Sequence, residues 1–486
     1  MKILSGTGDY KKVKTELKIY AYVKDRKEDV LKLLDKDAAR LMNKPLKNIL
    51  NGIRFIDEEG IWYAFLQLPE TKKINTESFR RLGGDITKEI KHTRADDIAV
   101  VIPGIENLTA DAAVHGVVEG IVLGEYTYEE LKTVKEDDKP KKDYTIHLYS
   151  AGKKEILQKN IDRTFKIASA TNEARKLADT PSNMMTPKLF TDIVVQKAKK
   201  EGLKVTVLDE KILTKNGWNA LVGVSKGSYE PPRVVIVEYN GGKSGGQRYV
   251  VVGKGVTFDS GGISIKPSSG MEEMKFDMAG AAAAVMIPIL SKRLGLPVNV
   301  IAIAPLAENM PGGKAQKPGD VVKTLSGKTV EIISTDAEGR MILADALYYA
   351  VDRYKPKYLI DLATLTGACV VALGSEASGI MGNDDELVKM LIKAGEKSGD
   401  RLWELPLWDV YKDLLKSDVA DMKNSGSRWG GAIQGGIFLK EFINDTRWAH
   451  VDIAGTAYLD RSKPYFTKGA TGAGVRLLIS FIEGLK

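Results

Sequence analysis

VEIISTDAEGRMILADALYYAVDRY, residues 330–354, is the stretch around which the rest of the chain is organised. It begins with a β-branched run, residues 330–333, which predicts a short buried strand, and it ends in a segment whose apolar residues recur at helical spacing. Between the two lie Asp336, Glu338 and Arg340, and in extended backbone such alternate side chains point the same way. The pattern predicts two carboxylates and a guanidinium at a strand end, where α/β sheets have their ligand crevice. A solvated acidic turn that caps the helix is the alternative interpretation.

Length and composition predict an ordinary globular protein of two domains. The chain has 486 residues, of which 43% are hydrophobic and 28% charged. No uninterrupted apolar run approaches the ~20 residues that a membrane span needs, and residues 1–12 do not resemble a secretory signal, so we expect no membrane association. The single cysteine, Cys369, lies in an apolar stretch, which favours a buried structural thiol and a reducing, cytoplasmic location.

Strand-like and helix-like segments alternate along the chain, which predicts an α/β fold. We expect a smaller N-terminal α/β domain over residues 1–155 with mostly parallel strands, a connecting helix over 156–180, and a larger C-terminal α/β domain over 181–486. The larger domain should have a mixed central sheet flanked by helices. In the first domain the predicted strands are 17–23, 61–68, 96–102 and 144–150, the predicted helices are 29–44, 76–92 and 111–124, and 132–143 is a charged loop. In the second domain the predicted strands are 203–209, 233–239, 248–253, 298–304, 330–333, 357–363 and 448–454.

A second stretch of polar residues, 254–286, follows the predicted strand 248–253. Lys254, Asp259, Lys266 and Asp277 are interleaved there with glycines. A surface ion pair is the simpler interpretation of any one of these lysines.

The two stretches together bring four carboxylates and three cations to neighbouring strand ends. Crowded carboxylates repel one another unless cations join them, and two divalent ions ~3.5–4 Å apart would supply that charge. The four histidines are scattered and no HExxH pattern is present, so a zinc site built from histidines is not expected.

The segments VGKGVTFDSGGISIKPSSGMEEMKFDMAGAAA and STDAEGRMILADAL resemble the leucyl aminopeptidase (cytosol aminopeptidase) family, peptidase family M17. The likeness extends through residues 177–190, 361–368 and 448–458, and so covers the second domain, whereas the first domain matches in size and alternation only. The chain departs from the family at Ser334, where asparagine is usual. This change affects loop positioning and none of the family's metal ligands.

The resemblance implies a dinuclear metal site. Asp259 and Glu338 would bridge two ions, Asp336 would complete one position, and Lys254 with Asp277 would complete the other. As a ligand Lys254 must be uncharged, because an ammonium has no lone pair. Zn²⁺ is the expected metal, with Mn²⁺, Co²⁺ or Mg²⁺ in the exchangeable position.

The resemblance also implies the reaction: release of N-terminal amino acids, Leu and Met types preferred, from peptides with a free N-terminus through attack of a metal-activated hydroxide. Lys266 would stabilise the oxyanion, and Arg340 would hold a bicarbonate ion that acts as general base. The first-residue pocket would be shaped by Met274, Thr364, Leu365, Gly367 and Ala457, although Met274 taken alone is more often ordinary core. Family members form homohexamers, as dimers of trimers, and we expect the same here.

Two other interpretations stay open. A net charge of +8 and a pI near 9.0 permit an additional DNA-binding or architectural role, as in some bacterial relatives, although the chain has no long basic stripe. A catalytically silent relative is the third interpretation, and the intact set of charged site residues argues against it.

Overall fold

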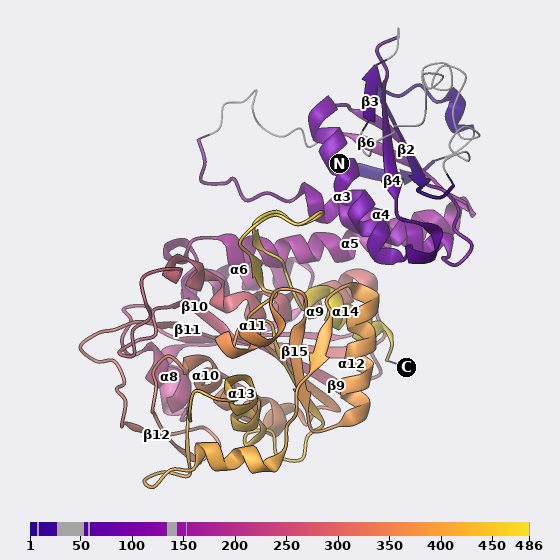
Figure 1. Ribbon diagram of the computed structural model, residues 1–486. Helices are drawn as coiled ribbons and strands as arrows, with labels where there is room; N and C mark the ends of the chain where they lie inside the picture. The colour runs from indigo at the N-terminus through magenta and orange to yellow at the C-terminus, as the bar shows by residue number, and fades with distance from the viewer. Residues whose placement is uncertain (7–8, 27–52, 57–58, 134–142, 152, 486) are drawn as a thin grey trace. The chain divides into compact units, whose positions relative to one another are not determined.

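The computed structural model describes residues 1–6, 9–26, 53–56, 59–133, 143–151 and 153–485 (Figure 1). The chain forms two compact units: Met1–Ser169 with Arg461–Thr467, and Ala170–Asp460 with Lys468–Lys486. The division falls inside helix α5, Lys154–Asp179, which contains most of the expected connector. The limits 1–155, 156–180 and 181–486 stay a prediction.

The smaller unit is built on a six-stranded sheet in the order β1-β6-β5-β2-β4-β3. Its pairs are parallel except for β3 with β4, which confirms the expected mostly parallel arrangement. The strands are β1 Lys2–Ser5, β2 Leu17–Val23, β3 Ile53–Ile56, β4 Trp62–Leu68, β5 Asp97–Val101 and β6 Thr145–Tyr149, with helices α3 Thr76–Thr93 and α4 Ala110–Glu125. The predicted helix 29–44 and most of the predicted loop 132–143 lie outside the described residues.

A nine-stranded mixed sheet forms the centre of the larger unit, in the order β16-β15-β18-β14-β9-β11-β8-β7, with β10 paired to β11. Strands β18, β14, β9 and β11 are parallel neighbours, and β8 and β15 pair in antiparallel fashion on either side of them. The predicted mixed central sheet is therefore confirmed. Its strands are β7 Lys204–Leu208, β8 Arg233–Asn240, β9 Arg248–Gly253, β10 Gly255–Asp259, β11 Asn299–Asn309, β14 Tyr358–Ala363, β15 Ser378–Gly382, β16 Leu402–Glu404 and β18 Trp448–Asp452.

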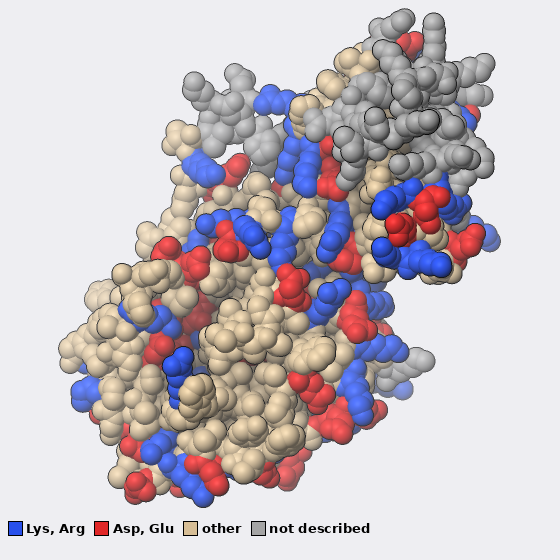
Figure 2. Space-filling view, in the orientation of Figure 1, with Lys and Arg blue, Asp and Glu red and all other residues tan. Residues whose placement is uncertain are grey.

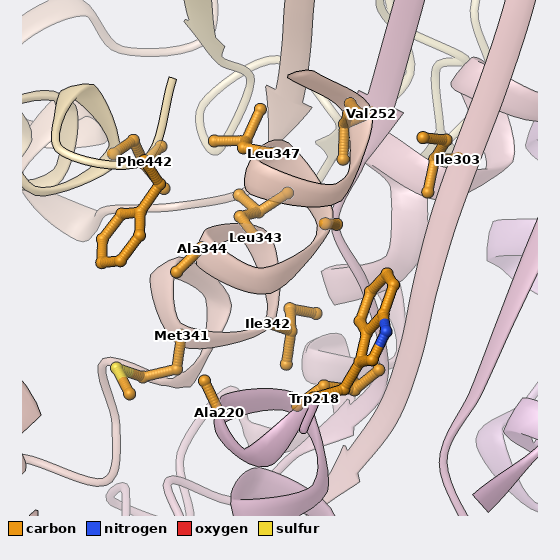
Figure 3. Packing of buried hydrophobic residues seen from close by; sticks show 14 of the residues in the cluster. Trp218, Ala220, Val252, Ile303, Met341, Ile342, Leu343, Ala344, Leu347 and Phe442 are labelled. Atoms are coloured by element: carbon orange, nitrogen blue, oxygen red, sulfur yellow. The ribbon is translucent and has the colours of Figure 1, made fainter. Parts of the chain in front are cut away.

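Helices cover both faces of this sheet (Figure 1). One face packs against α6 Pro187–Lys200, α9 Ala279–Leu294, α12 Asp385–Ser398 and α14 Val475–Glu483, and the other against α8 Asn219–Ser225, α10 Glu338–Tyr354 and α13 Gly431–Lys440. Helix α10 lies at the centre of the second layer, where Leu343 and Leu347 belong to the same buried cluster as Val252 of β9 and Ile303 of β11 (Figure 3). Because these apolar side chains are packed against the sheet, α10 has a fixed position, and so does Glu338 at its start.

The decisive stretch folds differently from the prediction in one respect. Strand β13 covers only Thr329–Glu331 and belongs to a separate three-stranded sheet with β12 Val321–Lys323 and β17 Met422–Lys423. Glu338 and Arg340 are already helical, so the expectation of extended backbone through all three charged positions is wrong. A turn followed by the first turn of a helix brings these residues together instead.

One helical stretch among the described residues, Met271–Leu294, is long and apolar enough to cross a membrane by length and composition alone. It consists of the 3₁₀ segment η6, Met271–Met278, and α9. Of its most apolar window, 89% is buried inside the protein, as is usual for a core helix.

Candidate metal centre

The five predicted metal ligands come from four segments of the larger unit that meet at one edge of its central sheet. Lys254 lies between β9 and β10, and Asp259 is the last residue of β10. Asp277 lies in η6 just before α9, Asp336 lies in the turn before α10, and Glu338 is the first residue of α10. The five residues and Lys266 form two groups of ion pairs, one around Lys254 and one around Lys266, and carboxylate oxygens of the two groups lie within 4.8 Å of each other.

Lys254 is the buried cation of this network. Its Nζ lies 2.8 Å from Asp277 Oδ2 and 2.8 Å from Glu338 Oε1, and it donates to the carbonyl of Thr364 at 2.8 Å. Burial disfavours the charge, but the surrounding carboxylates outweigh burial and raise the pKa of Lys254. These carboxylates therefore favour the ammonium form of Lys254.

Lys266 connects the other two carboxylates. Its Nζ lies 2.9 Å from Asp259 Oδ2 and 2.5 Å from Asp336 Oδ1. Burial again opposes the charge and the nearby carboxylates outweigh it, so the pKa of Lys266 is raised.

The carboxylates exceed the cations within the cluster. Burial raises the pKa of Asp259, Asp277 and Asp336, and the charge of Glu338 adds to the effect on the first two. Ligand atoms of Asp259, Asp336 and Glu338 all lie within 4.8 Å of one another. Glu338 Oε2 is buried and has no hydrogen-bond partner among the described residues. Excess negative charge, closely spaced oxygens and an unpartnered carboxylate oxygen fit divalent cations.

Arg340 is buried on the same first turn of α10, with 7% of its surface exposed. Its Nη1 donates to the carbonyl oxygen of Asn424 at 2.8 Å, and its Nε has no hydrogen-bond partner among the described residues. Burial lowers the pKa of Arg340 to about 10, which still leaves a cation at neutral pH. Arg340 cannot itself act as a base there.

Two of the predicted pocket residues contact the site directly. Thr364 Oγ1 donates to Asp277 Oδ1 at 2.7 Å, and the backbone N–H of Leu365 donates to Asp452 Oδ1 at 3.2 Å. Both follow β14, so the end of that strand holds the pocket loop against the metal ligands. The other three lie in different segments. Met274 is in η6 with Asp277, Gly367 is at the start of α11 Gly367–Leu373, and Ala457, which is fully buried, follows β18.

Sequence reasoning missed the polar residues that orient the ligands. Asn309 Nδ2 donates to Asp259 Oδ1 at 2.8 Å and to the carbonyl of Thr335 at 3.0 Å. Asp452 accepts from Leu365 and from the hydroxyl of Thr366, which fixes the pocket loop. Asn309 and Asp452 are the last residues of β11 and β18, two strands of mostly apolar residues, and this position was the available signal.

The Cys369 thiol plays no part in the cluster. It is 1% exposed, and burial raises its pKa to about 12. The expectation of a buried structural thiol is confirmed, because a group with this pKa is not a nucleophile near neutral pH.

Comparison with known families gives matches over both units. A family model for the cytosol aminopeptidase catalytic domain matches residues 172–479, and one for the N-terminal domain of the same family matches residues 68–135. The chain is 46% identical over 447 residues to a probable cytosol aminopeptidase of Geotalea uraniireducens, covering 90% of this chain and 89% of the relative. It is 42% identical over 416 residues to one of Cenarchaeum symbiosum, covering 85% and 84%.

Solved structures agree with these matches. The bottromycin maturation enzyme BotP is 32% identical and superposes with a TM-score of 0.85, covering 97% of this chain and 99% of BotP. BotP in complex with Mn gives the same TM-score and identity.

Proposed function

The chain belongs to the cytosol aminopeptidase family, M17, and is an aminopeptidase, and from that premise we propose that its cluster holds two divalent ions that serve hydrolysis of the first peptide bond. The family is metal-dependent, and the BotP neighbour with Mn supports a transition-metal site. The observation that carries the proposal is the meeting of Asp259, Asp336 and Glu338 within 4.8 Å beside Lys254 and Asp277. When bound, two such ions act as Lewis acids and lower the pKa of a water molecule.

The ligand assignment is the one that the family resemblance implies. Asp259 and Glu338 are assigned as bridging residues, and their carboxylate oxygens lie within 4.8 Å of each other and of Asp336. Asp336 with its Lys266 contact marks one position, and Lys254 with Asp277 marks the other. Lys254 has to release its proton to serve as a ligand.

The roles of the remaining charged residues follow from their exposure and donors. Lys266 is assigned to stabilise the oxyanion of the substrate, as the family resemblance implies, and its ammonium lies beside Asp259 and Asp336. Arg340 is assigned to bind a small planar anion, bicarbonate by family analogy, since its buried Nε has no partner among the described residues. In this assignment that anion is the general base and Arg340 positions it.

We assign the first-residue pocket to Met274, Thr364, Leu365, Gly367 and Ala457. The side chains of Met274 and Leu365 are apolar and partly exposed, which favours Leu- and Met-type residues at the peptide N-terminus.

A hydrolysis panel tests the function. After treatment with a chelator, the protein is assayed on aminoacyl amides with Zn²⁺, Mn²⁺, Co²⁺ or Mg²⁺ added singly. Leu-amide and Met-amide should be the fastest substrates, and N-acetyl-Leu-amide should not be cleaved because it has no free amine. Failure to hydrolyse Leu-amide with either Zn²⁺ or Mn²⁺ would contradict the proposal.

We also propose a homohexamer made of two trimers. Large apolar side chains are exposed on the larger unit, at Val371, Trp403, Trp408, Val410 and Trp429, and Figure 2 shows a broad area with few charges over α11 and α13. Such surface is typical of self-association. Light scattering should give a mass near six times 53.2 kDa, and a monomer at micromolar concentration would contradict it.

A cytoplasmic location remains a prediction that accords with the family. The additional DNA-binding role gains no support from the surface: on the face in Figure 2, Lys and Arg are mixed with Asp and Glu. We therefore do not propose it.

A further inference from the structure

The backbone of the decisive stretch, between β13 and α10, is held by the side chain of Asn424. Asn424 directly follows β17, and its side chain is fully buried. Its Oδ1 accepts from the backbone N–H groups of Ile333 at 2.8 Å and Ser334 at 3.3 Å, and its Nδ2 donates to the carbonyl of Ser334 at 2.7 Å. All three are backbone groups of the segment that leads to Asp336.

These bonds extend the short sheet beyond its last strand residue. Strands β13 and β17 pair in parallel at Val330 with Met422 and at Glu331 with Lys423, and the pairing ends there. The N–H of Asn424 then donates to the carbonyl of Glu331 at 2.9 Å. Past that point the amide side chain replaces the missing strand partner, since a carboxamide offers the same donor and acceptor as a peptide group. The chain can therefore leave the sheet and turn while its backbone remains satisfied.

The turn itself is completed by the residue that departs from the family. Ser334 Oγ accepts from the N–H of Asp336 at 3.2 Å, a bond that an asparagine at this position would also make. Asn424 fixes the backbone of Ser334, and Ser334 fixes the start of Asp336. The hydroxyl thus serves as a functional replacement for the usual amide.

Asn424 also reaches the other half of the site. Its carbonyl oxygen accepts from Arg340 Nη1 at 2.8 Å, the hydrogen bond that orients the buried guanidinium. One residue therefore contacts both the segment that carries Asp336 and the side chain of Arg340.

We propose that Asn424 is a positioning residue that sets Arg340 and the Asp336–Glu338 carboxylates relative to each other. This inference rests on the proposed function, because it gives those groups a common task. Removal of the Asn424 amide should leave the N–H groups of Ile333 and Ser334 and the carbonyl of Ser334 without these partners, so the segment shifts and the metal ligands lose alignment.

The chain offers a matched control in Asn299. This residue is also buried, and its side chain likewise holds a loop by accepting from Gly242 N–H and donating to the carbonyls of Lys243 and Gln247. That loop joins β8 to β9 and carries none of the assigned site residues. Asn424→Ala and Asn299→Ala should therefore lower the melting temperature by similar amounts, but only Asn424→Ala should change metal affinity and kcat.

The test compares these two variants with the unchanged protein by Mn²⁺ titration calorimetry, thermal unfolding, and kcat and KM for Leu-amide. Asn424→Ala should weaken metal affinity by about 10–100-fold and lower kcat, with KM changed much less, whereas Asn299→Ala should change neither affinity nor kcat. Equal effects of the two variants, or none from Asn424→Ala, would overturn the proposal. If Asn424→Ala does not fold, Asn424→Asp serves instead, because its carboxylate can keep both acceptor bonds while its second oxygen replaces the donor to Ser334 and repels that carbonyl; wild-type affinity and kcat would then overturn the proposal.

Two further measurements separate the possible failures. In an Arg340→Ala background the effect of Asn424→Ala on kcat should be smaller than in the unchanged protein, because the part that acts through Arg340 is already lost, while its effect on metal affinity should remain. An undiminished effect on kcat would contradict the role toward Arg340. If the unchanged protein bound Mn²⁺ but cleaved no aminoacyl amide, the proposed function would fail, and the affinity comparison would still decide the role of Asn424.

Discussion

Lys266 is the charged residue of the site whose removal should affect the reaction and spare the metal ligands. Lys266 contacts the assigned ligands Asp259 and Asp336, but it supplies no ligand atom itself. Lys266→Ala should lower kcat by about 10²–10³-fold, the usual cost of removing one oxyanion donor. Metal content, measured by plasma mass spectrometry, should stay at the wild-type value. Lys266→Arg should recover part of the rate because the charge is kept. Near-wild-type activity of Lys266→Ala would remove the oxyanion role.

A second residue-scale prediction concerns Asp345 of α10. Its fully buried carboxylate accepts from the backbone N–H groups of Ala220, Leu221 and Leu325 at 2.8–3.1 Å, and so ties α10 to the start of α8. Asp345→Asn sets an NH₂ group against one of these donors and should cost about 1–3 kcal/mol of unfolding free energy. Urea denaturation measures the cost, with Asp352→Asn on the exposed side of the same helix as control.

The same carboxylate predicts a pH dependence. Burial raises the pKa of Asp345 to about 7, although the three N–H donors lower it. The folded state therefore binds this proton more tightly than the unfolded chain, so the contribution of Asp345 to stability falls as pH rises from about 4 to 7. The stability of Asp345→Asn should depend less on pH in that window than that of the unchanged protein. Parallel curves would contradict the assignment.

At the scale of single elements, helix α9 packs closely against β14 and against the backbone of Lys254. An added Cβ at Gly280 would lie 2.2 Å from the carbonyl oxygen of Leu362 in β14. The next residue, Ala281, donates its N–H to the carbonyl of Lys254 at 2.8 Å. The small residues of the helix thus allow it to support the backbone of a metal ligand.

Gly280→Ala tests this close approach. The variant should lose about 1–3 kcal/mol of stability through overpacking, and its metal affinity should fall because the backbone of Lys254 is displaced. Gly313→Ala is the control, since nothing lies within 4 Å of a Cβ there and its backbone is not in the left-handed region. Thermal unfolding and metal titration measure both effects. A stable Gly280→Ala with unchanged affinity would mean that the helix can move without consequence for the site.

At the scale of the whole molecule, metal binding should stabilise the fold. A ligand that binds only the folded state at 100 times its Kd adds about 2.7 kcal/mol of stability. Chelated protein should therefore unfold at lower temperature than protein with added Mn²⁺, and the difference should disappear in Asp259→Ala. Because Lys254 must release a proton whose pKa is raised, the stabilisation should grow as pH rises. Equal melting temperatures with and without metal would contradict a metal site in the folded protein.

The sequence by itself determined the local structure and the identity of the charged residues. Strand and helix patterns depend on nearest neighbours, so segments such as 17–23 and 248–253 coincide with β2 and β9. The sequence likewise identifies the charged residues of the site, and the family resemblance implies a role as metal ligand for five of them: Lys254, Asp259, Asp277, Asp336 and Glu338. Family membership could be inferred on that basis.

Only the tertiary structure decided how those residues meet. Asp336 and Glu338 converge through a turn and a helix start, whereas the local pattern predicted extended backbone, because the short β13 runs out of strand partners after Glu331. The groups that satisfy the freed backbone and orient the ligands, Asn424 and Asn309, are distant in sequence from the groups that they bind. Hydrogen bonding of buried backbone depends on which segments fold against each other, and that information exists only in three dimensions.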